Sequence, residues 1–227
     1  MTTGLVLLAG GVGKRMERDV PKQLLLIGGK PILLHALEKV ERIAEIGQVV
    51  VTCPGDYLEQ IEALLRNRNL QRFRCVPGGA TRQESVYLGL KALAPCDRVV
   101  VHEAVRPFVT VEEYRRLLDC PEESAFYGLP IPFTVLKGAR WVEDIVPREE
   151  LVNVQLPQKF PYAKLLAVHE QARAEGRAFT EDAGMYHHYT GEPVRVLPGS
   201  EYNIKITYPM DIVLGEVIYR ERILRKG

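Results

Sequence analysis

The sequence is poor in cysteine and has none of the spacings that bind metals or build disulfide frameworks. Its 227 residues contain four cysteines, which lie more than twenty residues apart and form no C-x-x-C pair. A structural zinc site and a disulfide framework are therefore not expected. Reduced thiols are typical of a cytoplasmic protein, and we expect that location.

A long apolar run and a basic leader are also missing. No run approaches the ~20 apolar residues of a membrane span, and Met1-Thr2-Thr3 leads directly into an apolar stretch. These features predict a protein that is neither exported nor bound to a membrane. The formal net charge is only +1, so nonspecific nucleic-acid binding through a broad positive field is not expected. Any anion site must be built locally.

Familiar catalytic constellations are missing as well. No Ser-His-Asp arrangement and no pair of carboxylates stands out, and His187-His188 has no carboxylate at ligand spacing. The hydrophobic content of 46% is nevertheless sufficient for a sizeable core. We expect a single domain over residues 1–227.

An apolar run that ends in a glycine-rich loop dominates the N-terminal region. Residues 5–16 read LVLLAGGVGKRM, and Pro21-Lys22-Gln23 follows after four more residues. Glycines let a backbone approach a ligand closely, and the neighbouring cations neutralise anionic charge. The segment predicts a polyphosphate site, and hence a nucleotide site.

Two better-known phosphate loops do not match these letters. A P-loop ending at Gly13-Lys14 requires glycine at position 8 and Ser or Thr at position 15, where the chain has Leu8 and Arg15. A dinucleotide fingerprint starting at Gly11 requires a small residue where Met16 stands. A kinase-like phosphotransferase is therefore disfavoured.

The order of apolar segments predicts a doubly wound α/β sheet, largely parallel, with ligands at the carboxyl ends of its strands. The loops at 77–80 and 103–107 leave such ends, and Thr180 is a plausible N-cap for a helix that begins at 180–183. Predicted strands cover 3–9, 49–52, 73–76, 98–102, 125–131, 194–197 and 203–206, and predicted helices cover 32–40, 57–65, 162–174 and 210–224.

Residues 133–155 have poor helical periodicity and read as short alternating strands. Such a stretch buries little surface alone, so we expect a projecting β-arm that packs against a second subunit.

The signature A-G-G-x-G-x-R-M-x-x-x-x-P-K-Q resembles that of the 2-C-methyl-D-erythritol 4-phosphate cytidylyltransferases, which act in non-mevalonate isoprenoid precursor synthesis. The resemblance covers nearly the whole chain. It continues through Gly78-Gly79 with Arg82 and Ser85, His102 to Pro107, Leu156-Pro157-Gln158, Thr180 to Ala183, and Asn203-Ile204-Lys205 with Thr207.

This resemblance implies a fold, a reaction and partners. The fold is a doubly wound, mostly parallel, Rossmann-like nucleotidyltransferase sheet with a projecting β-arm. The reaction joins CTP to 2-C-methyl-D-erythritol 4-phosphate and releases pyrophosphate, with Mg²⁺ held mainly by the CTP phosphates and water. The partner is a second copy of the chain, joined through the arm at 133–155.

The expected site residues follow from charge and from the resemblance. Arg15 and Lys22 are the cations expected to stabilise the transition state. The resemblance implies that Arg148 from a partner's arm and Lys205 hold the acceptor phosphate, with Arg106 and Thr180 near the sugar-alcohol. The expected nucleotide-binding residues are Ala9, Gly10, Gly11, Gly13, Gly79, Ala80, Ser85 and Glu103, of which Glu103 also faces the acceptor.

Two departures from the family pattern leave the acceptor open. Glu103 stands where the family has aspartate, and Leu156 stands where it has threonine. A ribitol 5-phosphate cytidylyltransferase or another sugar-phosphate nucleotidyltransferase of the same fold is the nearest alternative. A noncatalytic nucleotide-sensing module is a more remote one, because the chain retains Arg15 and Lys22.

Overall fold

A seven-stranded sheet forms the centre of the protein in the computed structural model, which describes residues 1–11, 20–68 and 72–222. The strand order is β11-β7-β10-β6-β1-β4-β5, and only β10 runs antiparallel to its neighbours. The strands are β1 (Thr3–Leu8), β4 (Ile46–Cys53), β5 (Phe73–Pro77), β6 (Arg98–Glu103), β7 (Ala125–Pro130), β10 (Val152–Pro161) and β11 (Arg195–Pro198).

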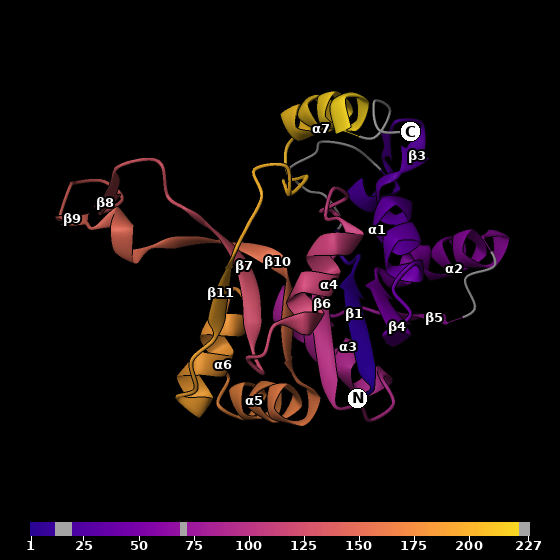
Figure 1. Cartoon of the computed structure of the whole chain (residues 1–227), viewed down its shortest axis with the longest axis horizontal. Coiled ribbons are helices and arrows are strands. Elements are labelled where there is room, and N and C mark those ends of the chain that lie inside the picture. Colours follow the sequence, from indigo (N-terminus) through magenta and orange to yellow (C-terminus); the bar gives the residue numbers. More distant parts are fainter. Residues whose placement is uncertain (12–19, 69–71, 223–227) are drawn as a thin grey trace.

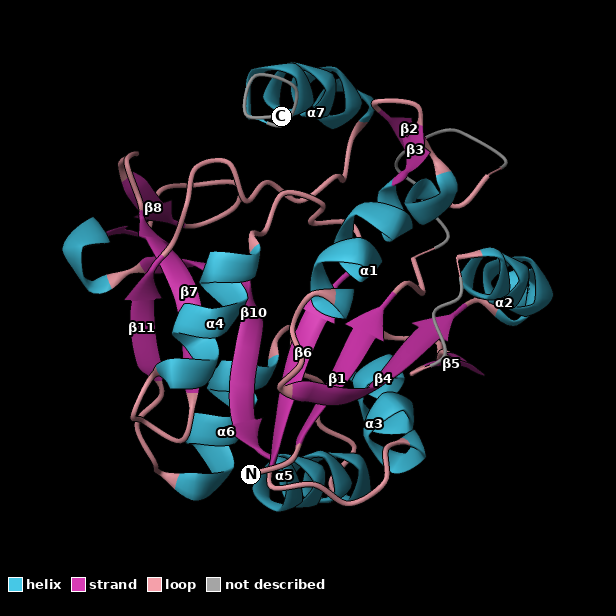
Figure 2. Cartoon of the chain, turned by 45° about the vertical axis from the view of Figure 1, so that its right-hand side comes forward, coloured by secondary structure: helices cyan, strands magenta, loops and turns pink. Residues whose placement is uncertain are grey.

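Helices cover both faces of this sheet (Figure 2). Every residue of β1 is buried, as expected for a central strand with apolar side chains on both faces. Leu5 and Leu7 belong to the core on one face, while Val6 and Leu8 belong to the core on the other. The helices are α1 (Ile32–Glu41), α2 (Leu58–Asn67), α3 (Arg82–Ala92), α4 (Val111–Asp119), α5 (Tyr162–Ala174), α6 (Asp182–Thr190) and α7 (Pro209–Arg222).

The last helix, α7, lies at the end of the sheet where the parallel strands finish (Figures 1 and 2). A small third core joins it there to a short hairpin of β2 (Leu26–Ile27) and β3 (Lys30–Pro31). Ile218 of α7 and Ile27 of β2 are both buried in this core. The third core therefore closes the sheet at its ligand-binding end.

The predicted arm is present as a projection from the sheet (Figure 1). Its outer part is an antiparallel pair of β8 (Val135–Lys137) and β9 (Asp144–Val146). The boundary differs from the predicted one, because residues 152–155 already belong to β10 and pair with β7 in the main sheet. The alternating pattern at 152–155 belongs to the start of β10, which pairs with β7, rather than to a free arm strand.

Two local predictions were wrong. Residues 203–206 form no strand, although Ile206 N–H donates to the Val105 carbonyl at 2.9 Å. Their apolar and polar alternation arises because Ile206 enters the third core while Lys205 faces a cavity. The N-cap of α6 is Glu181 and not Thr180, since the Glu181 carboxylate accepts hydrogen bonds from the backbone N–H groups of 183 and 184. The other strand and helix predictions above were confirmed, with shifts at their ends.

No helix within the described parts of the chain is long and apolar enough to span a bilayer.

Candidate active site

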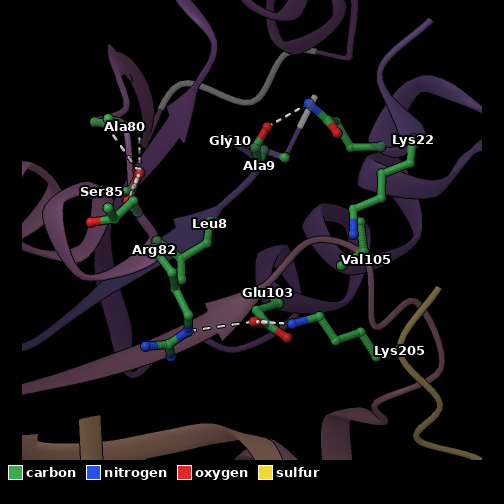
Figure 3. A pocket seen from close by; sticks show the side chains of 14 residues that line it. Leu8, Ala9, Gly10, Lys22, Ala80, Arg82, Ser85, Glu103, Val105 and Lys205 are labelled. Atoms are coloured by element: carbon green, nitrogen blue, oxygen red, sulfur yellow. Dashed lines mark hydrogen bonds and ion pairs between the residues drawn. The ribbon is translucent and has the colours of Figure 1, made fainter. Parts of the chain in front are cut away.

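A cavity of about 420 Å³ lies at the carboxyl ends of β1 and β6, which finish side by side with Leu8 opposite Glu103. Figure 3 shows side chains from both halves of the chain converging on it. The residues that line it are Leu8, Ala9, Gly10, Gly11, Lys22, Gln23, Gly79, Ala80, Thr81, Arg82, Ser85, Glu103, Val105 and Lys205.

The first wall of the cavity is the beginning of the glycine-rich loop. Ala9 N–H donates to the Thr52 carbonyl at 2.7 Å, and the Gln23 side-chain amide donates to the Ala9 carbonyl. Both backbone groups of Ala9 are thus bonded within the protein, which fixes the start of the loop. A Cβ atom at Gly11 would lie 3.0 Å from Cε of Lys22, so glycine gives this lysine its room.

Lys22 is a buried cation beside that loop, with its Nζ 3.3 Å from the Ile206 carbonyl. It precedes Gln23 in a short 3₁₀ helix, Lys22–Leu24, which begins behind Pro21. The predicted partners Gly13 and Arg15 lie outside the described residues.

The second wall is the loop between β5 and α3. Thr81 caps α3 by accepting from Glu84 N–H at 3.0 Å, and Ser85 Oγ accepts from Gly79 N–H at 3.1 Å. A Cβ atom at Gly79 would meet Glu84 Cγ at 2.1 Å, so a side chain there would displace Glu84 from its position. The loop therefore presents the amino-terminal end of α3, with its partial positive charge, to the cavity.

The floor of the cavity is an ion cluster around Glu103. Its carboxylate accepts from Lys205 Nζ at 2.8 Å and from Arg106 Nε at 3.1 Å, and Arg82 Nε lies 3.4 Å away. Burial raises the pKa of Glu103, but Lys205, Arg106 and Arg82 outweigh burial and lower the pKa to about 2. Glu103 is therefore ionised, and it holds three cations, of which Arg82 and Lys205 border the cavity (Figure 3).

Arg106 lies behind this floor and ties it to the C-terminal segment. Its Nη1 donates to the Asn203 carbonyl at 3.0 Å, and the Asn203 side chain donates to the Leu156 carbonyl at 2.7 Å. The segment that carries Lys205 is thereby held against β10. This explains how a loop without strand pairing places a lysine in the cavity.

Most of the predicted site residues meet in one place. Arg106 contacts Glu103 from behind the floor, while Thr180 and Arg148 are not among the residues that line the cavity. Arg148 lies on the arm, is half exposed and donates to the Pro132 carbonyl at 3.1 Å. The predicted residues that do line the cavity are Ala9, Gly10, Gly11, Lys22, Gly79, Ala80, Ser85, Glu103 and Lys205.

Sequence reasoning gave no role to Gln23 and assigned no site role to Arg82. Gln23 is fully buried and holds the carbonyl of Ala9. Arg82 lines the cavity and contacts Glu103. Two signals in the sequence could have pointed to them. Gln23 follows directly after Lys22 in the Pro21-Lys22-Gln23 segment, and Arg82 stands in the first turn of a helix that follows a glycine loop.

Few carboxylate side chains line the cavity, which limits the ligands that the protein can give to a metal ion. Within the described residues, no three His, Cys, Asp or Glu side chains are grouped for a metal, and Glu103 is the carboxylate among the lining residues. Because Glu103 already contacts three cations, the donor set fits an ion held mainly by ligand phosphates and water, which Mg²⁺ prefers.

The fold and the cavity define a class: an α/β protein that binds a nucleotide at the carboxyl edge of a largely parallel sheet. Comparison with known proteins makes this specific. Residues 3–221 match the family "2-C-methyl-D-erythritol 4-phosphate cytidylyltransferase", and the chain belongs to this family.

Relatives with that name match over almost their whole length. The protein from Halalkalibacterium halodurans is 35% identical over 98% of this chain and 99% of its own. The protein from Clostridium botulinum strain Langeland is 37% identical over 94% of this chain and 96% of its own.

Solved structures agree with this assignment. A 4-diphosphocytidyl-2C-methyl-D-erythritol synthase from Anaerococcus prevotii has a TM-score of 0.84 and 27% identity over 97% of this chain and 99% of its own. A 2-C-methyl-D-erythritol 4-phosphate cytidylyltransferase from Thermus thermophilus has a TM-score of 0.77 and 29% identity over 97% of this chain and 100% of its own. The predicted fold class and enzyme class are confirmed.

Proposed function

We propose that this enzyme transfers the cytidylyl group of CTP to 2-C-methyl-D-erythritol 4-phosphate, giving 4-diphosphocytidyl-2-C-methyl-D-erythritol and pyrophosphate. Membership of the family and the names of the relatives support the reaction. The observation that carries it is the cation arrangement: Lys22, Lys205 and Arg82 border one cavity beside two glycine loops.

The reaction joins two anions, so repulsion is the main barrier. An oxygen of the acceptor phosphate attacks the α-phosphorus of CTP, the bond to the bridging oxygen breaks, and its electron pair leaves with pyrophosphate. A phosphate monoester has a second pKa of about 6, so the nucleophile is already largely dianionic at neutral pH. No side-chain base is needed, in agreement with the lack of such a constellation in the sequence.

Lys22 supplies positive charge where negative charge grows, at the oxygens of the α-phosphorus and the leaving pyrophosphate. Its burial beside Gly11 makes the charge fixed and poorly screened. Arg15, from the same loop, is the second cation of this step, with the planar fork that suits phosphate oxygens. The backbone of Gly10, Gly11 and Gly13 lets the triphosphate approach closely.

The acceptor is held on the Glu103 side of the cavity. Lys205 binds its phosphate, and Arg106, Thr180 and Glu103 lie toward the sugar-alcohol. Glu103 keeps Lys205 and Arg106 in place before the acceptor arrives, so little reorganisation is needed during the reaction.

The cytosine base is read by backbone groups of the two loops and by Ser85. Cytosine has an amine where uracil has a carbonyl, so backbone carbonyls that accept from it are left unpaired by UTP. Because both backbone groups of Ala9 are already bonded to Gln23 and Thr52, and both of Gly79 to Ser85, we assign the reading to the carbonyls of Gly10 and Ala80, with Ala9 and Gly79 fixing their position.

Mg²⁺ is the proposed cofactor, and Glu103 is the cavity carboxylate that would support it while the nucleotide and water supply most of its ligands. When bound, the ion would neutralise phosphate charge. The four cysteines are free within the described residues, in keeping with the proposed cytoplasmic location.

We also propose that two copies join through the arm. The arm exposes Phe133, Leu136, Trp141, Val142 and Ile145, which a monomer leaves in water. Helix α7 exposes a stripe at Met210, Val213, Leu214 and Val217, with the spacing of one helix face. In the dimer, Arg148 of a second copy joins Lys205 at the acceptor phosphate.

An assay of four nucleoside triphosphates against several polyol phosphates tests the reaction. Pyrophosphate is expected only with CTP and methylerythritol phosphate. Equal turnover with ribitol 5-phosphate would move the assignment to that relative. CTP binding without any turnover would make the protein a nucleotide sensor.

A further inference from the structure

A line of buried polar and charged side chains connects helices α5 and α6 to the floor of the cavity. His169 Nε2 lies 3.0 Å from Asp182 Oδ1, and Arg82 Nη2 donates to Asp182 Oδ2 at 2.8 Å. The Nε of the same arginine lies 3.4 Å from Glu103. Arg82 is thus held between two carboxylates, Glu103 and Asp182, that are far apart in the sequence.

His169 and Asp182 are polar side chains in an otherwise apolar setting. The side chains of His169 and Asp182 are 0% and 1% exposed, on helices whose other buried residues form an apolar core. An apolar pair of similar volume at such a position is often as stable as an ion pair, because desolvation offsets most of the attraction. The pair lies next to a residue that lines the cavity, which points to a role there.

Asp182 changes how the ions on the floor are shared. Glu103 Oε1 accepts from Lys205 at 2.8 Å and lies 3.4 Å from Arg82, so the lysine has the closer contact. Without Asp182, the guanidinium of Arg82 has only the Glu103 carboxylate to bind. Arginine commonly binds a carboxylate through two parallel hydrogen bonds. Arg82 would then move from the nucleotide loop toward Glu103 and compete with Lys205.

We propose that Asp182 is a positioning residue for Arg82, that His169 orients Asp182, and that Arg82 so placed contacts the bound nucleotide. The proposal deepens the proposed function, because it adds a nucleotide contact and its support to the same cavity. Arg82 begins α3 immediately after the loop of Gly79 and Ala80, where the guanidinium reaches the cavity (Figure 3). Helices α5 and α6, which carry His169 and Asp182, therefore support the active site without contacting substrate.

The direct test is a cycle of Asp182→Asn and Arg82→Gln, read by calorimetric binding of CTP and by kcat and KM for both substrates. Asp182→Asn keeps the shape and one acceptor but removes the charge. Because the lost hydrogen bond is to a charged group, we expect CTP affinity to fall about tenfold. Arg82→Gln should weaken CTP binding at least as much, and the double variant no more than Arg82→Gln alone.

His169→Gln keeps a donor toward Asp182 and should retain most of the affinity, whereas His169→Leu should weaken CTP binding in the direction of Asp182→Asn. The matched control is Glu170→Gln on the same helix, whose ion pair with Lys91 is half exposed at 3.7 Å and should have no effect.

Three outcomes would overturn the proposal. They are unchanged CTP affinity in Asp182→Asn, full additivity of Asp182→Asn with Arg82→Gln, and wild-type CTP affinity in His169→Leu. If Asp182→Asn alone does not fold, the double variant, which removes both charges, gives the comparison with Arg82→Gln. Because CTP binding is measured without the acceptor, failure of this proposal is distinct from failure of the acceptor assignment, which the substrate matrix tests.

Discussion

The floor of the cavity and the projecting arm both contain ion pairs, but these differ in burial. On the floor, Glu103 is 7% exposed and contacts three cations. On the arm, Lys137 and Glu143 are both about two-thirds exposed at 3.8 Å, and Arg148 is half exposed beside Glu149. Exposed pairs contribute about 0–1 kcal/mol and rearrange easily, whereas buried, connected charges keep their geometry.

The same residue types therefore serve two purposes in this protein. The buried cations are fixed before substrates arrive, so they stabilise growing negative charge without reorganising. Arg148 on the arm loses little free energy when it leaves its exposed partner Glu149, so it is available to bind a ligand in a second copy.

The largest effect is expected from Lys22→Met, which keeps the buried methylenes and removes the charge. Loss of one preorganised charge contact should lower kcat by on the order of 10²-fold or more. Thermal unfolding should change little, because the substitution conserves volume in a buried position. Lys30→Met, at a partly exposed pair with Glu38, is the control and should leave kcat unchanged. A fully active Lys22→Met would remove this lysine from the mechanism.

Glu103→Gln should damage stability as well as activity. It leaves Lys205, Arg106 and Arg82 without their shared carboxylate, and breaking such a buried cluster costs about 3–5 kcal/mol. The effect is measurable by urea unfolding at pH 7.

The same variant has a pH signature. The pKa of Glu103 falls from 4.5 to about 2 on folding, so its contribution to stability is complete above pH 4.5 and is lost as the pH falls toward 2. Asp182 behaves alike, from 3.8 to about 2. Glu103→Gln should therefore lose less stability than the wild type between pH 4.5 and 2. Identical acid slopes would contradict the charge cluster.

Arg148→Ala should give a smaller and more selective effect. If a second copy supplies this arginine, KM for the acceptor should rise about tenfold, the loss of one charged hydrogen bond, while CTP affinity stays unchanged.

Trp141→Ser on the exposed arm should shift sedimentation toward monomer and raise the same KM. Arg140→Ala on the same arm is the control. An active monomer with normal acceptor KM would exclude a role for Arg148 in trans.

The smallest effect separates Thr180 from Glu181. Glu181 caps α6, so Glu181→Ala should lower the free energy of unfolding by about 1 kcal/mol. Thr180→Val should leave stability unchanged and alter only the KM for the acceptor. The opposite pattern in thermal unfolding would restore Thr180 as the cap.

Much of the sheet was predictable because its strands are locally apolar. β1 is buried throughout, and β4 and β6 each end in five buried residues. One glycine loop follows β1 and the other follows β5. The reversal of β10 was not predictable in the same way. Its residues at 152–155 alternate like an arm strand, and only pairing with β7 shows that they belong to the sheet.

The site was predictable where its residues adjoin a loop signature and unpredictable where they meet across the chain. Lys22 and Gly79 stand in recognisable segments. The contact of Arg82 with Asp182 joins residues 100 positions apart, and that of Lys205 with Glu103 joins residues 102 positions apart. Such contacts depend on tertiary packing, which no local pattern encodes.

The most direct measurement is a crystal structure with CTP and a nonreactive acceptor analogue bound. The account predicts that Lys22 Nζ lies within hydrogen-bond distance of an oxygen on the α- or β-phosphate, and that Lys205 remains on Glu103 while reaching the acceptor phosphate. A structure in which Lys22 stays on the Ile206 carbonyl and makes no phosphate contact would contradict it.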